Sequence, residues 1–163
     1  MLDMLQTASA VRLAEPDDED NIVDLCRRML TEMAQPCDDT KTRLIVRSAI
    51  PYGRNDPESG SAWIGVIGDA GELKGTVYLT VQTPWHSTTP YLGQLWNFVA
   101  PEHRKSSHYT KQLMTFAQGT AERLRMELKA GVMSTGPGME RLYERMPGFE
   151  RIGAIYSFAG CSQ

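Results

Sequence analysis

This 163-residue sequence lacks the marks of membrane, secreted and nucleic-acid-binding proteins. No apolar run approaches the roughly 20 residues that a membrane span needs. The first residues, Met1-Leu2-Asp3-Met4, have neither the basic start nor the long apolar stretch of a secretory signal. A formal net charge of −3 does not supply the basic field that nucleic acids require. We therefore predict a cytoplasmic, globular protein that binds neither membrane nor nucleic acid.

The sequence also contains few cysteines and lacks the common nucleotide-binding motifs. The three cysteines, Cys26, Cys37 and Cys161, lack metal-ligand spacing and form no paired framework. We interpret them as reduced thiols and predict no metal site. Neither Gly-x-x-x-x-Gly-Lys-Ser/Thr nor Gly-x-Gly-x-x-Gly occurs, which disfavours the classical nucleotide-binding α/β proteins.

What is present fits one folded domain. Hydrophobic residues make up 41% of the chain and charged residues 23%, close to the averages of globular proteins. The length suffices to bury a core without disulfides or metal. We predict a loose, solvated lead-in over residues 1–10 and a single domain over residues 11–160.

Apolar spacing and turn residues predict ten elements. Pro36, Pro51 and Pro147-Gly148 are the expected helix ends, and a polar loop is expected from Tyr52 to Ser61. The predicted order β-α-α-β-β-β-α-β-α-β describes an α/β domain whose mixed central β-sheet is flanked by helices. Strands are predicted at 11–14, 62–68, 73–82, 91–99, 129–134 and 149–158. Helices are predicted from the acids at 15–20 to Met33, from the caps at 38–40 to Ile50, from Tyr109 to Leu128, and over Met139 to Met146.

The corner between the strand that ends at Val99 and the helix that begins at Tyr109 carries a chemical signal. Pro101 has no N–H for a strand ladder, so the strand stops before it. Two cations and two hydroxyls, Arg104 to Ser107, then precede the helix. Unpaired amides and the positive end of the helix dipole gather at such a start, which favours binding of an anion such as phosphate.

This corner resembles the acyl-CoA-binding motif of the GNAT superfamily, the acetyl-CoA-dependent N-acetyltransferases. The family pattern is a strand that ends Val-x-Pro, followed by Gln/Arg-x-x-Gly-x-Gly/Ala at the start of a helix. Arg104 matches the first position, whereas Ser107 and Tyr109 replace two small residues. Serine still offers its N–H and adds a hydroxyl, whereas the tyrosine ring must turn away or pack on the helix.

A second resemblance comes later in the chain, in the family's order. The family's Tyr-x-x-x-Gly-Phe appears here as Tyr143 to Phe149 with one extra residue, Pro147. The predicted order of elements is also similar to that of GNAT domains over nearly the whole chain. The resemblance implies an N-acetyltransferase that moves an acetyl group from acetyl-CoA to an amine of a small molecule or protein, by direct transfer in a ternary complex.

The resemblance also implies roles for individual residues. Backbone groups of Phe98 and Val99 would pair with pantetheine like an added strand, and an amide near Phe98 would polarise the thioester. The diphosphate would be bound by Arg104, Lys105, Ser106, Ser107, His108 and Tyr109.

Proton transfer is assigned less sharply. Tyr143 is the candidate general acid for the coenzyme thiolate, and the alternative is a buried core tyrosine. Glu102 is a weak candidate base acting through water, and the alternative is a surface carboxylate. Gln94 and Asn97 lie where a family base can sit, but an amide is not basic, so a water chain is the default acceptor.

One alternative belongs to a different class of function. A catalytically impaired GNAT-like module would bind acyl-CoA or a protein partner without turnover, in line with the two altered small positions, the extra Pro147 and the absence of an evident base. The sequence leaves the acceptor amine and the choice between a monomer and a homodimer open.

Overall fold

The computed structural model describes residues 11–55, 61–105, 108–131 and 138–153. They form two compact units, one before residue 134 and one from there on. Within the described ranges, no helix combines the length and apolarity that crossing a bilayer requires.

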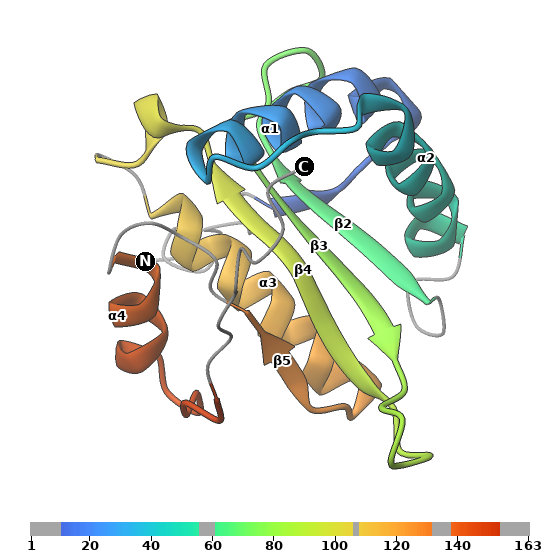
Figure 1. Ribbon diagram of the computed structural model, residues 1–163, viewed down its shortest axis with the longest axis vertical. Helices are drawn as coiled ribbons and strands as arrows, with labels where there is room; N and C mark the ends of the chain where they lie inside the picture. The colour runs from blue at the N-terminus through green and yellow to red at the C-terminus, as the bar shows by residue number, and fades with distance from the viewer. Residues whose placement is uncertain (1–10, 56–60, 106–107, 132–137, 154–163) are drawn as a thin grey trace, which may run out of the picture. The chain divides into compact units, whose positions relative to one another are not determined.

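The first unit is built on a five-stranded mixed sheet (Figure 1). The spatial order of the strands equals their order in the chain, and neighbours from β1 to β4 are antiparallel. β5 alone is parallel to its neighbour, β4. The strands are β1 (Val11–Leu13), β2 (Ala62–Ile67), β3 (Gly75–Gln82), β4 (Tyr91–Val99) and β5 (Leu128–Ala130).

Helices cover both faces of this sheet (Figure 1). α1 (Glu19–Glu32) and α2 (Asp39–Asn55) lie on one face, and α3 (Tyr109–Leu124) lies on the other. The 3₁₀ turn η1 (Pro16–Asp18) leads into α1, and the 3₁₀ turn η2 (Pro101–His103) follows β4. The second unit contains α4 (Gly138–Arg145).

Alternation along the strands creates two separate cores. Ile64 and Val66 of β2 pack with residues of α1 and α2, such as Val23 and Val46. Trp63, adjacent to Ile64 in the chain, points to the other face and belongs to the cluster formed with α3. Because successive side chains of a strand point to opposite faces, the fully buried β2 needs apolar residues at both parities.

The first nine predicted elements are confirmed in type and order, and the fold class is α/β with a mixed sheet. β4 has its predicted bounds, and α3 begins at Tyr109 as expected. The tenth element, a strand predicted over 149–158, is not seen in residues 149–153, which have no regular structure. The rest of that strand lies outside the described residues.

The prediction that Pro51 stops the second helix was wrong. α2 runs through Pro51 to Asn55, so Tyr52 and Gly53 are helical and not part of a loop. Proline removes one backbone donor, but its fixed φ suits a helix. The last turn lies close to β2, because a side chain at Gly53 would approach the carbonyl oxygen of Ala62 to 3.1 Å. This packing favours continuation of the helix despite the missing hydrogen bond.

The predicted end of the third helix was also wrong. α3 ends at Leu124, and Leu128, which continues its apolar spacing, is the first residue of β5. Arg125 ends the helix in the left-handed conformation, with φ +54°, and its N–H caps the last turn. Pairing of β5 with β4 provides the hydrogen bonds that another helical turn would otherwise supply.

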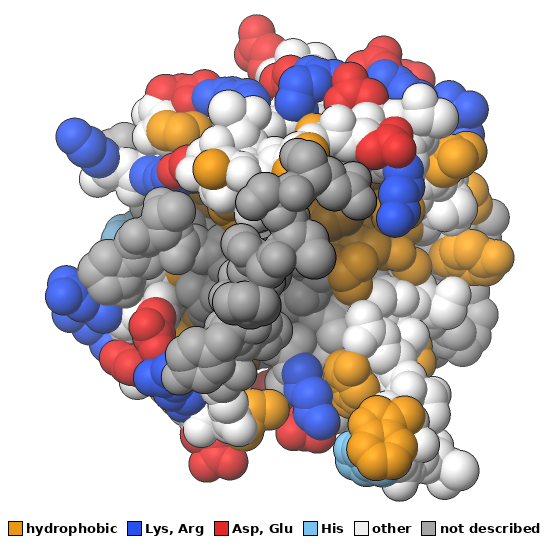
Figure 2. Space-filling view, in the orientation of Figure 1, with side chains coloured by type: hydrophobic (Ala, Val, Ile, Leu, Met, Phe, Trp, Pro, Cys, Tyr) orange, Lys and Arg blue, Asp and Glu red, His pale blue; other side chains and the backbone are white. Residues whose placement is uncertain are grey.

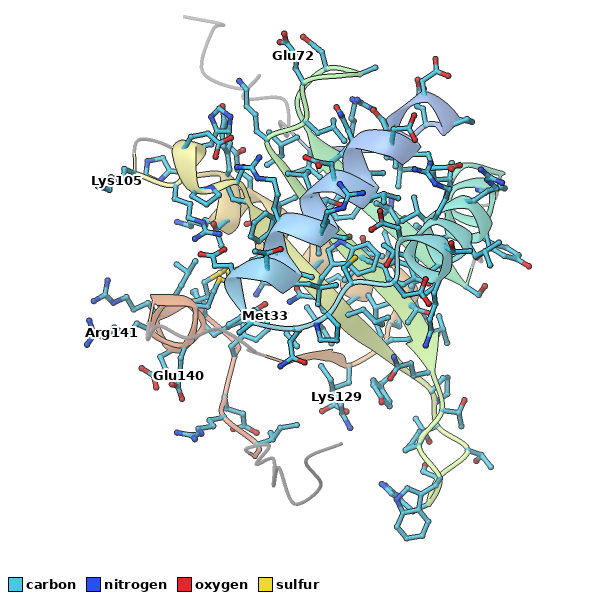
Figure 3. All side chains as sticks on the ribbon, turned by 45° about the horizontal axis from the view of Figure 1, so that its top comes forward. Met33, Glu72, Lys105, Lys129, Glu140 and Arg141 are labelled. Atoms are coloured by element: carbon cyan, nitrogen blue, oxygen red, sulfur yellow. The ribbon has the colours of Figure 1, made fainter. Side chains whose placement is uncertain are left out.

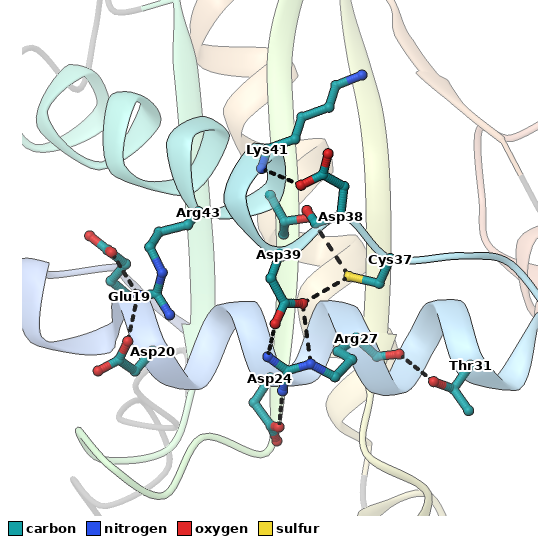
Figure 4. Close-up of polar contacts among 11 residues, drawn as sticks. Glu19, Asp20, Asp24, Arg27, Thr31, Cys37, Asp38, Asp39, Lys41 and Arg43 are labelled. Atoms are coloured by element: carbon teal, nitrogen blue, oxygen red, sulfur yellow. Dashed lines mark hydrogen bonds and ion pairs between the residues drawn. The ribbon is translucent and has the colours of Figure 1, made fainter.

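Ion pairs fasten α1 to α2 (Figure 4). Glu19 at the start of α1 accepts hydrogen bonds from Arg43 and Arg47 of α2 at 2.8–2.9 Å. The hydrogen bond from Arg47, together with that from Arg43, lowers the pKa of Glu19 from 4.5 to about 2 despite partial burial. Acidic and basic side chains alternate over α1 in the space-filling view (Figure 2), so this face carries little net charge.

Glu19→Gln is expected to remove stability that depends on pH. The depressed pKa stabilises the fold above pH 4.5, and this contribution is lost as the pH falls from 4.5 towards 2. The variant should melt about 2–4 °C lower at pH 7, which corresponds to roughly 1 kcal/mol for a domain of this size. Melting curves from pH 7 to pH 3 should show the difference shrinking. Glu122→Gln on the exposed face of α3 is the charge-matched control, and an equal, pH-independent loss in both variants would contradict the assignment.

The cysteines fit the interpretation as reduced thiols where they are described. Cys26 and Cys37 are free. Burial raises the pKa of the Cys26 thiol to about 12, so it stays protonated at neutral pH. Cys161 lies outside the described residues.

Candidate active site

The candidate site begins at an irregularity in β4. Trp96 pairs with Tyr78 of β3 and Gln94 pairs with Leu79, so Leu95 is an extra residue in β4. One strand with an extra residue forms a β-bulge, which bends the strand and changes the direction of the residues after it. Leu95 is 49% exposed at this point.

Past the bulge, β4 leaves its parallel neighbour. β5 pairs only with Leu92, Gly93 and Gln94, before the bulge. Within the described residues, the segment from Trp96 to Val99 has a strand partner on its β3 side alone. As far as the described residues go, this segment presents a free strand edge, and η2 follows it directly.

The register shows which backbone groups face the free edge. The N–H of Ala100 donates to the carbonyl of Lys74 at 2.9 Å, so Ala100 faces β3. Successive residues of an antiparallel strand direct their N–H and C=O to opposite edges. Val99 and Asn97 therefore face the free edge, whereas Phe98 faces β3. The backbone groups at this edge are therefore those of Asn97 and Val99, and those of Phe98 belong to the β3 ladder.

Asn97 also has an unusual side chain, which lies on the α3 face of the sheet together with Val77, its partner in β3. Its Nδ2 and Oδ1 atoms are both buried, and neither has a hydrogen-bond partner among the described residues. A buried polar group without a partner costs about 1–3 kcal/mol. The pantetheine arm of an acyl-CoA contains two secondary amides, and the backbone N–H and C=O groups of Asn97 and Val99 at this edge fit such a ligand.

The predicted diphosphate segment continues from the free edge to α3. The N–H of Arg104 closes the 3₁₀ turn on the carbonyl of Pro101 at 3.3 Å. Lys105 lies on the outside of the turn after η2 (Figure 3). His108 is the exposed N-cap residue of α3 and makes no side-chain cap. Ser106 and Ser107 lie outside the described residues.

The Tyr109 ring packs inward from the first position of α3. It contacts the core cluster between α3 and the sheet. Lys74, just before β3, donates to the Tyr109 hydroxyl at 3.5 Å and lies 5.7 Å from the ring centroid. The ring therefore turns towards the core, one of the two orientations that the altered small position required. Lys74 adds a cation near the start of α3 that sequence reasoning missed, because 35 residues separate it from Tyr109.

Arg104 has three partners. Its Nε donates to the carbonyl oxygen of Val99 at 2.8 Å, which agrees with this oxygen lying outside the β3 ladder. Its two terminal nitrogens contact the carboxylate of Glu32, at the end of α1, at 2.5 and 2.7 Å. Its guanidinium carbon lies 5.1 Å from the centroid of the Phe98 ring. Arg104 thus spans the gap between the free edge of β4 and α1.

Glu102, the candidate base, is paired as well. Arg28 of α1 donates to its carboxylate at 2.6 Å. This hydrogen bond lowers the pKa of Glu102 below its ordinary value. A carboxylate with a lowered pKa is a poorer proton acceptor.

In the second unit, Tyr143 lies on α4 and is buried. Its ring meets that of Phe149 edge to face, with centroids 5.0 Å apart and an interplanar angle of 68°. Gly148, between the two motif residues and after Pro147, has φ +84°, a backbone conformation that favours glycine. The Tyr-x-x-x-x-Gly-Phe segment therefore forms one compact turn around an aromatic pair, extra proline included.

Comparison with known proteins points to one fold. No protein-family model and no curated protein matches the sequence. Solved structures match over more than nine-tenths of the chain, and three of them share 12–14% identity with it. The ribosomal-protein-alanine N-acetyltransferase from Brucella melitensis biovar Abortus 2308 is 14% identical, with a TM-score of 0.63, and the match covers 92% of this chain and 98% of that one. AAC(6')-Iy in complex with the bisubstrate analogue CoA-S-monomethyl-acetylneamine is 12% identical, with a TM-score of 0.67 and coverages of 93% and 97%. A GNAT family acetyltransferase of Staphylococcus aureus subsp. aureus USA300_TCH1516 is 13% identical, with a TM-score of 0.59 and coverages of 91% and 96%.

These similarities cover nearly the whole of each chain. Because the sequence identities are low, the similarities establish the fold alone. The end of β4, η2 and the start of α3 make up the region on which the first sequence resemblance was based. The fold of this protein is that of the GNAT superfamily of acetyltransferases.

Proposed function

We propose that this protein is an N-acetyltransferase that moves an acetyl group from acetyl-CoA to an amine by direct transfer in a ternary complex. The observation that carries the proposal is the free edge of β4 after the bulge, with Asn97 and Val99 facing it and the start of α3 at its end. An extended chain with amides and a terminal diphosphate matches that sequence of groups. The similarity to acetyltransferase structures supports the same assignment.

The cosubstrate's contacts are assigned from the residues of the site. Backbone groups of Val99 and Asn97 pair with the amides of pantetheine. The unpaired N–H groups of the first turn of α3 face the diphosphate together with Ser106, Ser107 and His108. Lys105 and Lys74 add positive charge, and no carboxylate among the described residues forms an ion pair with either.

Acetyl transfer also requires movement of two protons. Tyr143 donates one to the departing thiolate, because a phenol is protonated at neutral pH. Ordered water takes the other from the acceptor ammonium. Glu102 is the weaker candidate, since it acts through that water only when Arg28 leaves it.

The acceptor is an amine of a small molecule or of a protein. The name of one similar structure gives the alanine of a ribosomal protein, and another was solved with an analogue built on acetylneamine. Because a single fold serves such different acceptors, the acceptor cannot be chosen from the fold.

Two measurements test the proposal. Calorimetry with acetyl-CoA measures binding, and a thiol-release assay over a panel of amines measures turnover. Binding with turnover is the expected result. Binding without turnover on any amine would instead support the impaired acyl-CoA-binding module, and absence of binding would support a protein-interaction role.

The impaired module has a specific observation in its favour. Arg104, which matches the family motif, is already engaged by Glu32 and by the Val99 carbonyl. The two measurements decide between the candidates, because both candidates bind acetyl-CoA and only the enzyme releases the thiol.

A further inference from the structure

Two crossed ion pairs join the last turns of α1 to the turn after β4. Arg28 of α1 pairs with Glu102, and Glu32 of α1 pairs with Arg104. Residues four apart on a helix lie on one face, so both α1 side chains point to the same turn. The four charges sum to zero, and each element contributes one charge of each sign.

The two ion pairs differ in how many donors of the arginine they use. The Arg28–Glu102 pair is a single contact between exposed side chains. The Glu32–Arg104 pair is bidentate, and Nε of the same guanidinium covers the Val99 carbonyl. Arg104 therefore has all three of its nitrogen positions engaged, and two of those positions carry the Glu32 carboxylate.

A guanidinium fork binds a carboxylate and a phosphate group in the same bidentate way. The Glu32 carboxylate thus takes the position on Arg104 that a phosphate oxygen pair would take. The Nε contact also places the guanidinium across the carbonyl that faces the free edge. Two N–H donors of Arg104 remain, one on each terminal nitrogen, but they point apart, so a diphosphate ligand that binds the fork must displace Glu32.

We propose that Glu32 sets the affinity of the site for its diphosphate ligand by competing with that ligand for the guanidinium of Arg104. The inference rests on the proposed function, since it takes coenzyme A as the ligand. When coenzyme A binds, the Arg104 side chain leaves Glu32 and the Val99 carbonyl and contacts the diphosphate. The end of α1 then loses one of its two ion pairs with the turn after β4. The Arg28–Glu102 pair remains as the second tie.

Glu32→Gln is the test, because it keeps the size of the side chain and removes its charge. Coenzyme A should bind the variant about threefold more tightly by calorimetry, the range that an exposed ion pair supports. Asp24→Asn is the matched control: it removes one carboxylate from the same helix, and that carboxylate pairs with Arg27 and not with Arg104. Arg28→Gln removes the neighbouring tie without releasing Arg104. Neither control should reproduce the gain.

Further readouts separate the competition from a general charge effect. In the free protein the Arg104 Nε–H signal should be observable by NMR and shift on addition of coenzyme A, and inorganic pyrophosphate should produce a shift in the same direction. Equal affinities for Glu32→Gln and Asp24→Asn, or a coenzyme A complex in which Arg104 still binds Glu32, would overturn the inference while leaving acetyl transfer intact.

The proposed function can also fail separately. Tighter pyrophosphate binding by Glu32→Gln without thiol release on any amine would support the competition and refute acetyl transfer. Absence of binding of either probe to the wild-type protein and to Glu32→Gln would refute both.

Discussion

Tyr143→Phe is expected to lower turnover by about 10²-fold, with little change in the affinity for acetyl-CoA. Phenylalanine keeps the ring and its edge-to-face contact with Phe149, so α4 and the turn after it should fold unchanged. The substitution removes the hydroxyl that would protonate the coenzyme thiolate. Steady-state kinetics of thiol release, together with calorimetry on the same preparation, separate the loss of chemistry from a loss of binding.

The control for this variant is another tyrosine hydroxyl that has a known partner. Tyr91 at the start of β4 donates to Gln82 at 2.7 Å, and Tyr91→Phe should lose only that hydrogen bond. Thiol release should keep its wild-type rate in this control. A wild-type rate in Tyr143→Phe would remove the acid assignment and leave Tyr143 as a core residue of the second unit.

Ser107→Glu is expected to weaken acetyl-CoA binding by at least about tenfold, because two like charges a few ångströms apart repel by several kcal/mol at an intermediate dielectric constant. The prediction comes from the motif, since Ser107 lies outside the described residues. Calorimetry provides the dissociation constant. Because the expected weakening is electrostatic, raising the salt concentration should reduce the difference in acetyl-CoA affinity between Ser107→Glu and the wild-type protein.

Ser107→Ala distinguishes the backbone from the side chain at this position. If the N–H alone binds the diphosphate, alanine should retain most of the affinity, and the loss should belong to the introduced charge. Unchanged affinity in Ser107→Glu would place the anion site elsewhere on the chain.

Local sequence patterns predicted the elements around the site well. β4 ends at Val99 because Pro101 has no N–H for the ladder, and α3 begins at Tyr109, where its apolar spacing starts. Where local sequence signals and tertiary packing favoured different element ends, the structure follows the packing. The proline rule placed a helix end at Pro51, but contact with β2 favours the extra turn. The apolar spacing carried the third helix to Leu128, but β4 offers that residue a strand partner.

The site itself was only half predictable. The motif indicated which segment to propose for the cofactor, and its departures at Ser107 and Tyr109 are visible in the sequence. The bulge at Leu95 decides which carbonyl faces the free edge, and a bulge depends on the register with β3. For that reason the backbone contacts that we propose involve Asn97 and Val99, whereas the backbone of Phe98 faces β3.

From its residues alone, this chain fixes the order of its strands and helices, the place where β4 stops and the anion-favouring start of α3, because each depends on neighbours a few positions away. Only the tertiary structure decides that Arg104 is bound by Glu32 and Glu102 by Arg28. These partners are 72 and 74 residues apart in the chain. No local pattern links charges so far apart, and they meet because α1 packs on the sheet face beside the end of β4.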